Sequence, residues 1–118
     1  MFVERADEGY REMAPGVHLR VLAYGASTLM GEFRLSAGYV LPAHTHPHEQ
    51  TGYLVRGHIR LRIGVEARDM RPGDSWSVPG GVEHSADLIE DSVAVEVWSP
   101  IREDLLSAQE VAPIPPAR

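Results

Sequence analysis

The sequence contains no cysteine, and none of its apolar stretches approaches the length that crosses a membrane. The lack of cysteine excludes disulfides, thiolate catalysis, and zinc or iron–sulfur sites with cysteine ligands. A metal ion bound by this chain would therefore be held by imidazole, carboxylate or amide groups. Charges are scattered through the N-terminal region, where a secretory signal would need an unbroken apolar core, so we expect a soluble cytoplasmic protein.

Basic residues are also in short supply. The chain has 11 basic residues against 17 acidic ones, and its formal net charge is −6. Proteins that bind nucleic acid usually carry a basic stripe or patch that contacts phosphates, so we expect no nucleic-acid partner. The length of 118 residues predicts a single domain, residues 1–118, that buries its own core.

Alternation of apolar and polar residues is the main structural pattern. Between His58 and Ile63 the apolar residues occupy every second position, which predicts a half-buried β-strand. The same period recurs at residues 17–24, 29–35 and 93–98, and clusters of Gly, Pro or Asp separate these segments. Many short strands with turn signals between them predict a β-sandwich or a β-barrel.

Helix signals are confined to the region near the C-terminus. Residues 100–106 begin with a proline, which the first turn of a helix tolerates, and acidic residues follow it. Residues 111–118 contain three prolines, so we expect this tail to be extended. The sequence therefore predicts an all-β domain with one short C-terminal helix.

Three of the six histidines lie close together in the sequence. Side chains two positions apart in a strand point to the same face, so His44 and His46 can bind one ion from a single strand. Pro47 favours an end to that strand and a turn that carries His48 away from the other two. We therefore expect His48 at the surface or in an interface.

A second cluster supplies a third imidazole. Glycine-bearing turns at residues 72–74 and 79–81 enclose a short strand, and His84 begins the strand that follows. If that strand returns beside the first, His84 meets His44 and His46 at one interior point. Two histidines from one strand, one from another and an oxygen ligand would bind a metal ion and leave open positions for water or substrate.

The same segments carry a family resemblance. Residues 38–57 resemble the first motif of the cupins, and residues 73–88 resemble the second, with glycines, prolines and histidines in register. The short spacing between the motifs is similar to that of compact bacterial cupins. The resemblance implies a single cupin barrel, which is a jelly roll also described as a double-stranded β-helix. The divalent metal ion would be held by His44, His46, Gln50 and His84.

Two positions depart from the commonest cupin pattern. Gln50 stands where a glutamate ligand is usual, and Leu88 stands where the second motif often has asparagine. A neutral amide leaves the site one charge unit more positive, which favours anionic ligands and strengthens the metal as a Lewis acid. Amide oxygen is a competent hard ligand, but Gln50 could instead hydrogen-bond beside a metal held by three histidines. Zinc, nickel, manganese and iron are all compatible with these donors.

The last predicted strand, residues 93–98, places Glu96 and Trp98 on one face and valines on the other. An inward Glu96 would be a buried carboxylate beside a metal, where acid/base groups are found. An outward Glu96 would be an ordinary surface residue. Periodicity alone leaves both orientations open.

A narrower resemblance bears on this choice. Residues 44–53 and 96–104 together resemble the pectin-degradation cupins, which convert cyclic 4,5-unsaturated uronates into linear keto forms. The resemblance implies that Glu96, Trp98 and Arg102 are the acid, the aromatic residue and the arginine of a catalytic site. The acid is usually aspartate in that family, and Glu96 is one methylene longer. We therefore expect an enzyme that acts on a small anionic sugar derivative.

Two other functions fit a cupin with such a site. One is an iron- or manganese-dependent dioxygenase, because open metal positions suit oxygen activation. The other is a non-catalytic module that binds a small anionic ligand, since this fold serves many unrelated roles. The Glu96 carboxylate favours catalysis, because an anion-binding pocket gains nothing from a negative charge.

The protein is also expected to be a homodimer. Small barrels with open edge strands commonly cover these edges by pairing. The candidate seams are the strand that carries Arg60 and Arg62 and the N-terminal segment.

Overall fold

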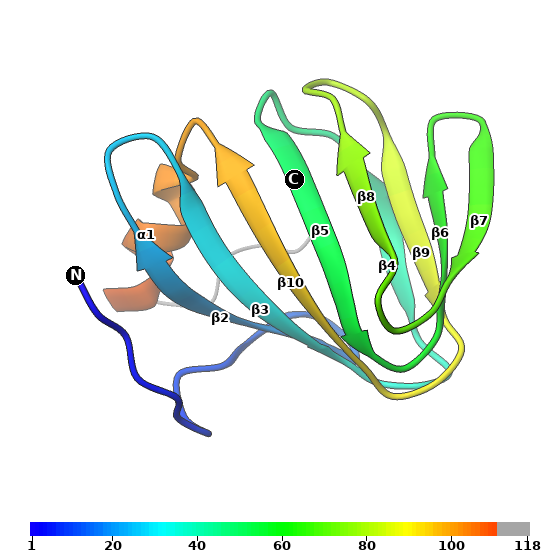
Figure 1. Ribbon diagram of the computed structural model, residues 1–118, viewed down its shortest axis with the longest axis horizontal. Helices are drawn as coiled ribbons and strands as arrows, with labels where there is room; N and C mark the ends of the chain where they lie inside the picture. The colour runs from blue at the N-terminus through cyan, green and yellow to red at the C-terminus, as the bar shows by residue number, and fades with distance from the viewer. Residues whose placement is uncertain (111–118) are drawn as a thin grey trace.

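The computed structural model describes residues 1–110, and antiparallel β-structure dominates it (Figure 1). The predicted all-β class and the short C-terminal helix are both confirmed. The predicted extended tail, residues 111–118, lies outside the described residues. The elements are β1 (Arg11–Ala14), β2 (Val17–Tyr24), β3 (Leu29–Leu35), β4 (Val40–His44), β5 (Glu49–Arg56), β6 (Ile59–Ile63), β7 (Glu66–Met70), β8 (Ser75–Val78), β9 (His84–Leu88), β10 (Ser92–Ser99) and α1 (Glu103–Glu110).

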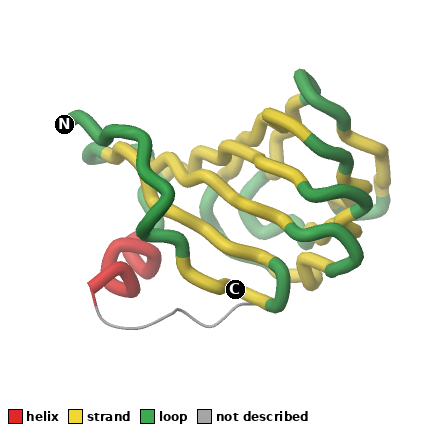
Figure 2. Tube along the Cα trace, turned by 90° about the horizontal axis from the view of Figure 1, so that it is seen from below, coloured by secondary structure: helices red, strands yellow, loops and turns green. Residues whose placement is uncertain are grey.

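The strands form two sheets that pack face to face. The larger sheet has the order β1-β2-β3-β10-β5-β8, and the smaller sheet has the order β4-β9-β6-β7. Strands far apart in the sequence, such as β3, β10 and β5, are neighbours, because the chain passes back and forth between the sheets as in a jelly roll. Figure 1 shows the larger sheet in front of β4, and Figure 2 shows α1 beside one end of the sheets.

Alternation along the strands determines which side chains fill the space between the sheets. In β3, Leu29, Gly31, Phe33 and Leu35 are buried, and the residues between them are more exposed. Trp98 from β10 packs edge-on against Phe33, with ring centroids 6.1 Å apart. The rest of the buried apolar core comes from both sheets and from α1: Ala14, Val17, Leu19, Leu54, Ile59, Leu61, Ala86, Leu88, Ala94 and Leu105.

Helix α1 packs at one end of the larger sheet and contacts β2. Its first turn carries Glu103 and Asp104, whose negative charges suit a helix N-terminus. Leu105 is buried in the core and fixes the helix to the sheet. Among the described residues there is no helix of the length and hydrophobicity needed to span a membrane.

The strand that carries the first histidine is shorter than expected. β4 ends at His44, so His46 lies in a loop rather than on the same strand, and the expectation of one shared strand is wrong. The cause is topological. β4 belongs to the smaller sheet and β5 to the larger one, so the backbone must leave the β4 ladder before Glu49, where β5 begins.

The strand with Arg60 and Arg62 is not an edge strand. β6 pairs with β7 on one side and with β9 on the other, so both of its hydrogen-bonding edges are used. The expectation that this strand offers an open edge for dimerisation is therefore wrong. Arg60 faces Asp69 of β7 and forms an ion pair with it, at 3.0 Å.

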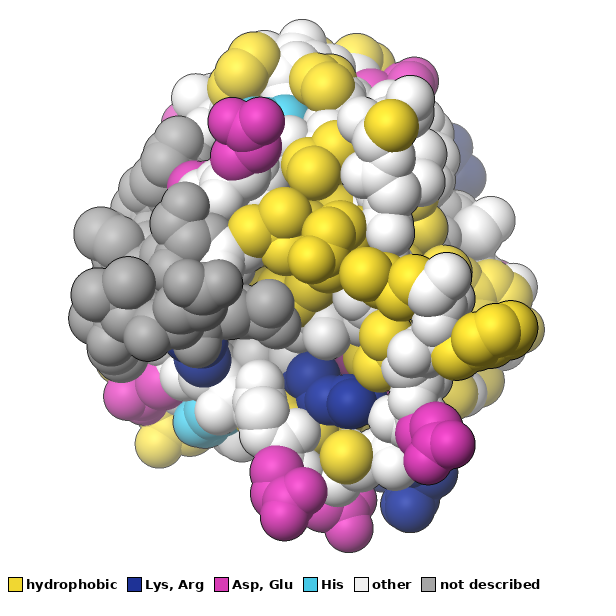
Figure 3. All heavy atoms as spheres, turned by 90° about the vertical axis from the view of Figure 1, so that its left-hand side faces the viewer, with side chains coloured by type: hydrophobic (Ala, Val, Ile, Leu, Met, Phe, Trp, Pro, Cys, Tyr) yellow, Lys and Arg dark blue, Asp and Glu magenta, His cyan; other side chains and the backbone are white. Residues whose placement is uncertain are grey.

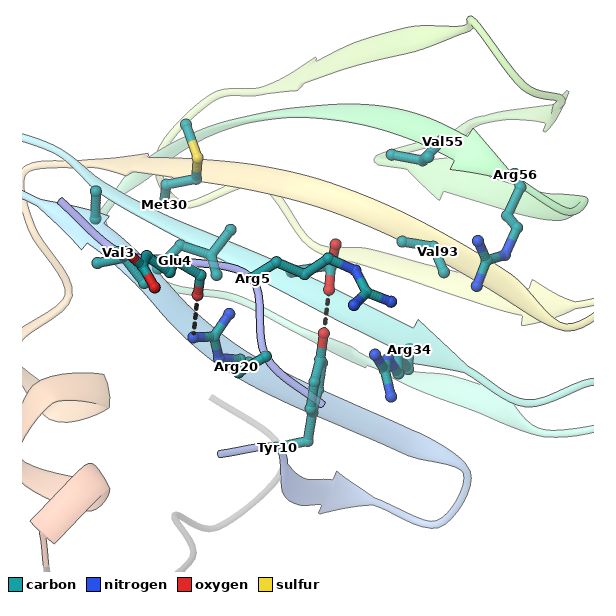
Figure 4. A pocket seen from close by; sticks show the side chains of 14 residues that line it. Val3, Glu4, Arg5, Tyr10, Arg20, Met30, Arg34, Val55, Arg56 and Val93 are labelled. Carbon is teal, nitrogen blue, oxygen red and sulfur yellow. Dashed lines mark hydrogen bonds between the residues drawn. The ribbon is translucent and has the colours of Figure 1, made fainter. Parts of the chain in front are cut away.

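The N-terminal segment crosses the outer face of the larger sheet and leaves a pocket of about 360 Å³ (Figure 4). Arg20 Nη2 donates a hydrogen bond to the Glu4 carbonyl oxygen at 3.0 Å, and the Tyr10 hydroxyl donates to the Glu32 carboxylate. The guanidinium of Arg34 lies over the Tyr10 ring, 4.0 Å from its centroid. These contacts fasten the segment to β2 and β3.

Candidate metal centre

Three histidines meet at one end of the β4–β9 pair. His44 is the last residue of β4 and His84 is the first of β9, and the two are cross-strand partners. Their ring centroids lie 4.2 Å apart, and the ring of His46 lies 4.9 Å from that of His84. One potential ligand nitrogen from each ring lies within 4.8 Å of the other two. The structure thus brings the three predicted imidazoles together, although His46 approaches from a loop.

Each of the three rings is held at its Nδ1 atom by a backbone carbonyl oxygen two residues away. A carbonyl oxygen only accepts, so each Nδ1 carries the proton and each Nε2 presents a lone pair. This is the tautomer that lets an imidazole bind a metal ion through Nε2. The pairs are His44 with Pro42 at 2.8 Å, His46 with His48 at 3.0 Å, and His84 with Val82 at 2.9 Å.

The Nε2 atoms show that a cation fits this cluster. His84 Nε2 is buried and has no hydrogen-bond partner within residues 1–110. His46 Nε2 lies 2.9 Å from Gln50 Oε1, so two acceptors face each other once the ring proton is on Nδ1. A buried acceptor without a donor is unfavourable, and a shared metal ion would satisfy both positions.

Gln50 presents its amide oxygen to the histidines because both ends of the amide are fixed. Trp98 Nε1 donates a hydrogen bond to Gln50 Oε1 at 2.9 Å, and Gln50 Nε2 donates to Glu96 Oε1 at 2.8 Å. The side chain is buried, whereas its neighbour Glu49 is exposed on the opposite face of β5. Gln50 Oε1 can therefore serve as a fourth ligand atom. Alternatively, it lies beside a metal ion that only the three histidines hold.

Burial keeps the three imidazoles neutral. It lowers the pKa of His84 to about 4, and it is also the main cause that lowers the pKa values of His44 and His46. The positive charge of Arg102 lowers all three pKa values as well. Neutral imidazole is the form that binds metal, so the cluster is ready for an ion at neutral pH.

Glu96 points inward, which is one of the two orientations that the sequence leaves open. Its side chain is 7% exposed, and its Oε1 accepts hydrogen bonds from Gln50 Nε2 at 2.8 Å and Trp76 Nε1 at 3.1 Å. Burial raises the pKa of Glu96 to about 7, although the two hydrogen bonds favour the ionised form and lower it. A carboxyl group with this pKa can accept and release a proton near neutral pH.

Arg102 follows β10 and is only 5% exposed. Its Nε and Nη2 atoms donate hydrogen bonds to the two carboxylate oxygens of Asp104, at 3.1 and 2.7 Å. Its guanidinium carbon lies 5.5 Å from the centroid of the Trp98 ring. Asp104 uses one edge of the planar group, so the edge with Nη1 is the one that can meet an anionic ligand.

His48 does not belong to the cluster. The group of converging ligand nitrogens consists of His44, His46 and His84. The contribution of His48 is the carbonyl oxygen that accepts from His46 Nδ1, while its ring centroid lies 5.7 Å from that of His46. His58 directly precedes β6, and its Nε2 lies 3.0 Å from Asp69 Oδ1 of β7.

Three residues of the site were not identified from the sequence. Trp76 and Asp104 hold the side chains of Glu96 and Arg102, and Gly52 lies between Trp76 and Glu96. Only Trp76 has a local sequence signal. It lies two positions before Val78 in the short predicted strand, so both side chains are expected on the same face. The other two depend on contacts that local patterns do not reveal.

The chain is similar in sequence or structure to several known proteins. The pectin degradation protein KdgF of Dickeya dadantii (strain 3937) is 25% identical over 99 residues, which cover 82% of this chain and 90% of that protein. The structure of KdgF from Halomonas sp. has a TM-score of 0.82 at 27% identity and covers 89% of this chain and 97% of that chain. An RmlC-like cupin from Shewanella frigidimarina NCIMB 400 shares the fold, with a TM-score of 0.83, 23% identity, and coverage of 88% and 94%.

The family model for the cupin domain matches residues 31–99. This range runs from β3 to the end of β10 and includes the two segments, 38–57 and 73–88, that resemble the cupin motifs. It also contains the histidine cluster and Glu96. The predicted resemblance to small cupins is confirmed, and the chain belongs to the cupin-domain family.

Proposed function

We propose that the protein is a metal-dependent enzyme that opens the ring of an unsaturated sugar acid, a uronate, and tautomerises the product. The observation that carries this proposal is the set of contacts from His46 to Gln50 and from Gln50 to Glu96. It places a buried carboxylate directly beside the candidate metal ligands. Burying a carboxyl group is unfavourable, and a proton-transfer reaction gives this group a use that simple anion binding does not.

The relatives support the same class of reaction. Two of them carry the name KdgF, and one of these is described as a pectin degradation protein. The resemblance of residues 44–53 and 96–104 to the pectin-degradation cupins implies cyclic 4,5-unsaturated uronates as substrates. The acid, aromatic residue and arginine of that resemblance, Glu96, Trp98 and Arg102, are all buried next to the histidine cluster in this structure.

The parts of the site suit this reaction. His44, His46 and His84 would hold the divalent metal, with Gln50 Oε1 as a fourth donor, and the bound ion would act as a Lewis acid toward substrate oxygens. Ring opening removes the proton of the anomeric hydroxyl while the bond between C1 and the ring oxygen breaks. Cleavage leaves an enolate at C5, and a proton is then added at C4 as this enolate becomes a ketone. Glu96 takes up the first proton and delivers the second, so no atom is gained or lost overall.

Substrate binding falls to the residues at the end of β10. Arg102 would pair with the substrate carboxylate through the edge that carries Nη1, while Asp104 holds the other edge. Trp98 is 2% exposed and lies beneath Arg102, so stacking of the sugar ring on Trp98 requires Arg102 to shift.

The direct test is to measure the metal content of the purified protein and then follow an unsaturated uronate by NMR with and without it. We expect the vinyl signal of C4 to disappear and keto-acid signals to appear at unchanged mass, and we expect no conversion after chelation. Oxygen-dependent formation of an oxidised product would favour the dioxygenase instead. Saturable binding without conversion would favour the binding module.

Arg102→Lys should raise KM for the uronate by about 10-fold while lowering kcat by a smaller factor. Lysine keeps the positive charge but lacks the planar fork that bonds to two carboxylates. Steady-state kinetics with metal-loaded protein measures both constants. Arg60→Lys, which alters the surface ion pair with Asp69, is the matched control and should leave them unchanged. A fall in kcat larger than the rise in KM would contradict the carboxylate clamp.

We also propose that the protein is a homodimer joined through its N-terminal segment. β1 forms one edge of the larger sheet, and the segment before it exposes Met1, Phe2 and Val3. Figure 3 shows hydrophobic side chains in a band on the side of the molecule where the N-terminus lies. Pairing with a second copy would cover both the open edge and this apolar surface.

Sedimentation at micromolar concentration should therefore give twice the chain mass of 13.0 kDa. Phe2→Ser should shift the equilibrium toward monomer, because Phe2 is fully exposed in one chain and would be buried in the pair. Val65→Ser removes an equally exposed apolar side chain from the β6–β7 turn and should leave the dimer intact. A wild-type monomer would refute this assembly.

A further inference from the structure

We propose that Trp76 is a positioning residue that holds the Glu96 carboxylate toward the substrate. Gly52, which has no side chain, leaves the space in which the Trp76 and Glu96 side chains meet. This inference rests on the proposed function, because it assigns a purpose to the orientation of Glu96. It gives roles to two residues that are neither members of the histidine cluster nor among the predicted catalytic residues.

The sheet brings the two side chains toward each other across an intervening strand. Gly52 of β5 pairs with Trp76 of β8 on one side and with Glu96 of β10 on the other. Figure 1 shows β10, β5 and β8 side by side. Strands two apart in a sheet are separated by about 9.6 Å, so Trp76 and Glu96 can touch only if nothing projects from the residue between them.

Gly52 provides that gap. A Cβ atom at this position would lie 2.3 Å from Trp76 Nε1 and 2.4 Å from Glu96 Oε1, far inside van der Waals contact. The backbone of Gly52 does not adopt the positive φ that requires glycine at the turns of this chain. Glycine in the interior of a strand weakens it, and the close approach of two side chains explains its presence here.

The contact leaves one carboxylate oxygen for chemistry. Both hydrogen bonds to Glu96, from Gln50 Nε2 at 2.8 Å and from Trp76 Nε1 at 3.1 Å, end on Oε1. In the described part of the chain Oε2 has no hydrogen-bond donor. Two donors on Oε1 fix the rotation of the carboxylate, so Oε2 is the oxygen left for contact with a substrate.

The Trp76 side chain also lines a hollow on the side away from Glu96. The hollow has a volume of about 190 Å³, lies between the edge strands β7 and β8, and is also lined by Leu61, Ile63 and Met70. Removing the whole indole would therefore open the interior as well as break the hydrogen bond. Trp76→Phe is the informative substitution, because it keeps an aromatic ring at this position and removes the N–H donor with a smaller loss of volume than Trp76→Ala.

We expect Trp76→Phe to lower kcat for the unsaturated uronate by roughly 10-fold, with KM changed less than about 2-fold and metal content unchanged. The same substitution in a Glu96→Gln background should change the residual kcat by less than about 2-fold, because the carboxylate it positions is gone. Tyr53→Phe, on the exposed face of β5, is the matched control and should leave kcat unchanged. An equal loss in both backgrounds, or no loss in the wild-type background, would overturn the proposal.

A spectroscopic measurement decides the contact even if no uronate is converted. The ¹⁵N-labelled protein has two tryptophans and gives two indole N–H signals, and Trp76→Phe identifies the one from Trp76. Glu96→Gln should move this signal upfield more than that of Trp98, since a neutral acceptor replaces a charged one. Gly52→Ala should move it too, because the added Cβ drives the indole and the carboxylate apart. A Trp76 signal that stays in place in both variants would overturn the inference, whereas an inactive wild type with both shifts would refute only the proposed reaction.

Discussion

Protein in which His84 is replaced by alanine is expected to purify without stoichiometric metal and without measurable turnover. His84 Nε2 is buried with no partner in the described residues, so the substitution removes a ligand atom and no other contact of that nitrogen. Metal affinity should fall by more than about 100-fold, because changes in outer-shell partners alone cost 10- to 100-fold. His46→Ala should have the same effect. Elemental analysis and competition with a chelator measure the loss.

His48→Ala is the control for this experiment, since His48 lies near the cluster but contributes a carbonyl oxygen rather than its ring. This variant should keep its metal. Circular dichroism and thermal unfolding would establish that all three proteins are folded. Equal loss of metal from the His46, His48 and His84 variants would contradict the assignment of ligands.

Glu96→Gln is expected to lower turnover by roughly 10²- to 10⁴-fold with little change in substrate affinity. Glutamine has the same size, and its amide oxygen can still accept from Gln50 and Trp76, so the local packing is kept. Only the group that exchanges protons is removed. The measurement is kcat and KM for an unsaturated uronate with protein of verified metal content.

Glu49→Gln provides the matched control. Glu49 lies only three residues before Gly52 on the same strand, but its side chain is exposed on the opposite face. This change should leave turnover and metal content as they are. If Glu96→Gln were fully active on every uronate that the wild type converts, the acid/base role of Glu96 would be wrong.

Much of the fold could be predicted from local pattern. β2 and β3 have the bounds that alternation predicts, and β10 extends the predicted strand by one residue at each end. Alternation succeeds because each of these strands has one face against the core and one toward solvent. The place where the pattern failed, at His46, is where the chain leaves one sheet for the other, and period-2 reasoning does not register such a crossing.

The candidate site divides in the same way. Spacing predicted that His44, His46 and His84 could meet, and the structure brings them together. The resemblance to the first cupin motif added Gln50 as a candidate ligand. Spacing did not predict the contact between Trp76 and Glu96. That contact requires β8, β5 and β10 to be neighbours in one sheet, although long stretches of chain separate them in the sequence.

The sequence by itself determined the all-β class, the absence of thiolate chemistry and the three histidines of the candidate cluster, because composition and motif spacing can be read along the chain. The tertiary structure decided that Glu96 faces the interior, that Gln50 turns its oxygen toward His46, and that Asp104 holds Arg102. Each of these depends on which strands and loops pack together. A hydrogen bond fixes an orientation only after long-range pairing has brought donor and acceptor within reach of each other.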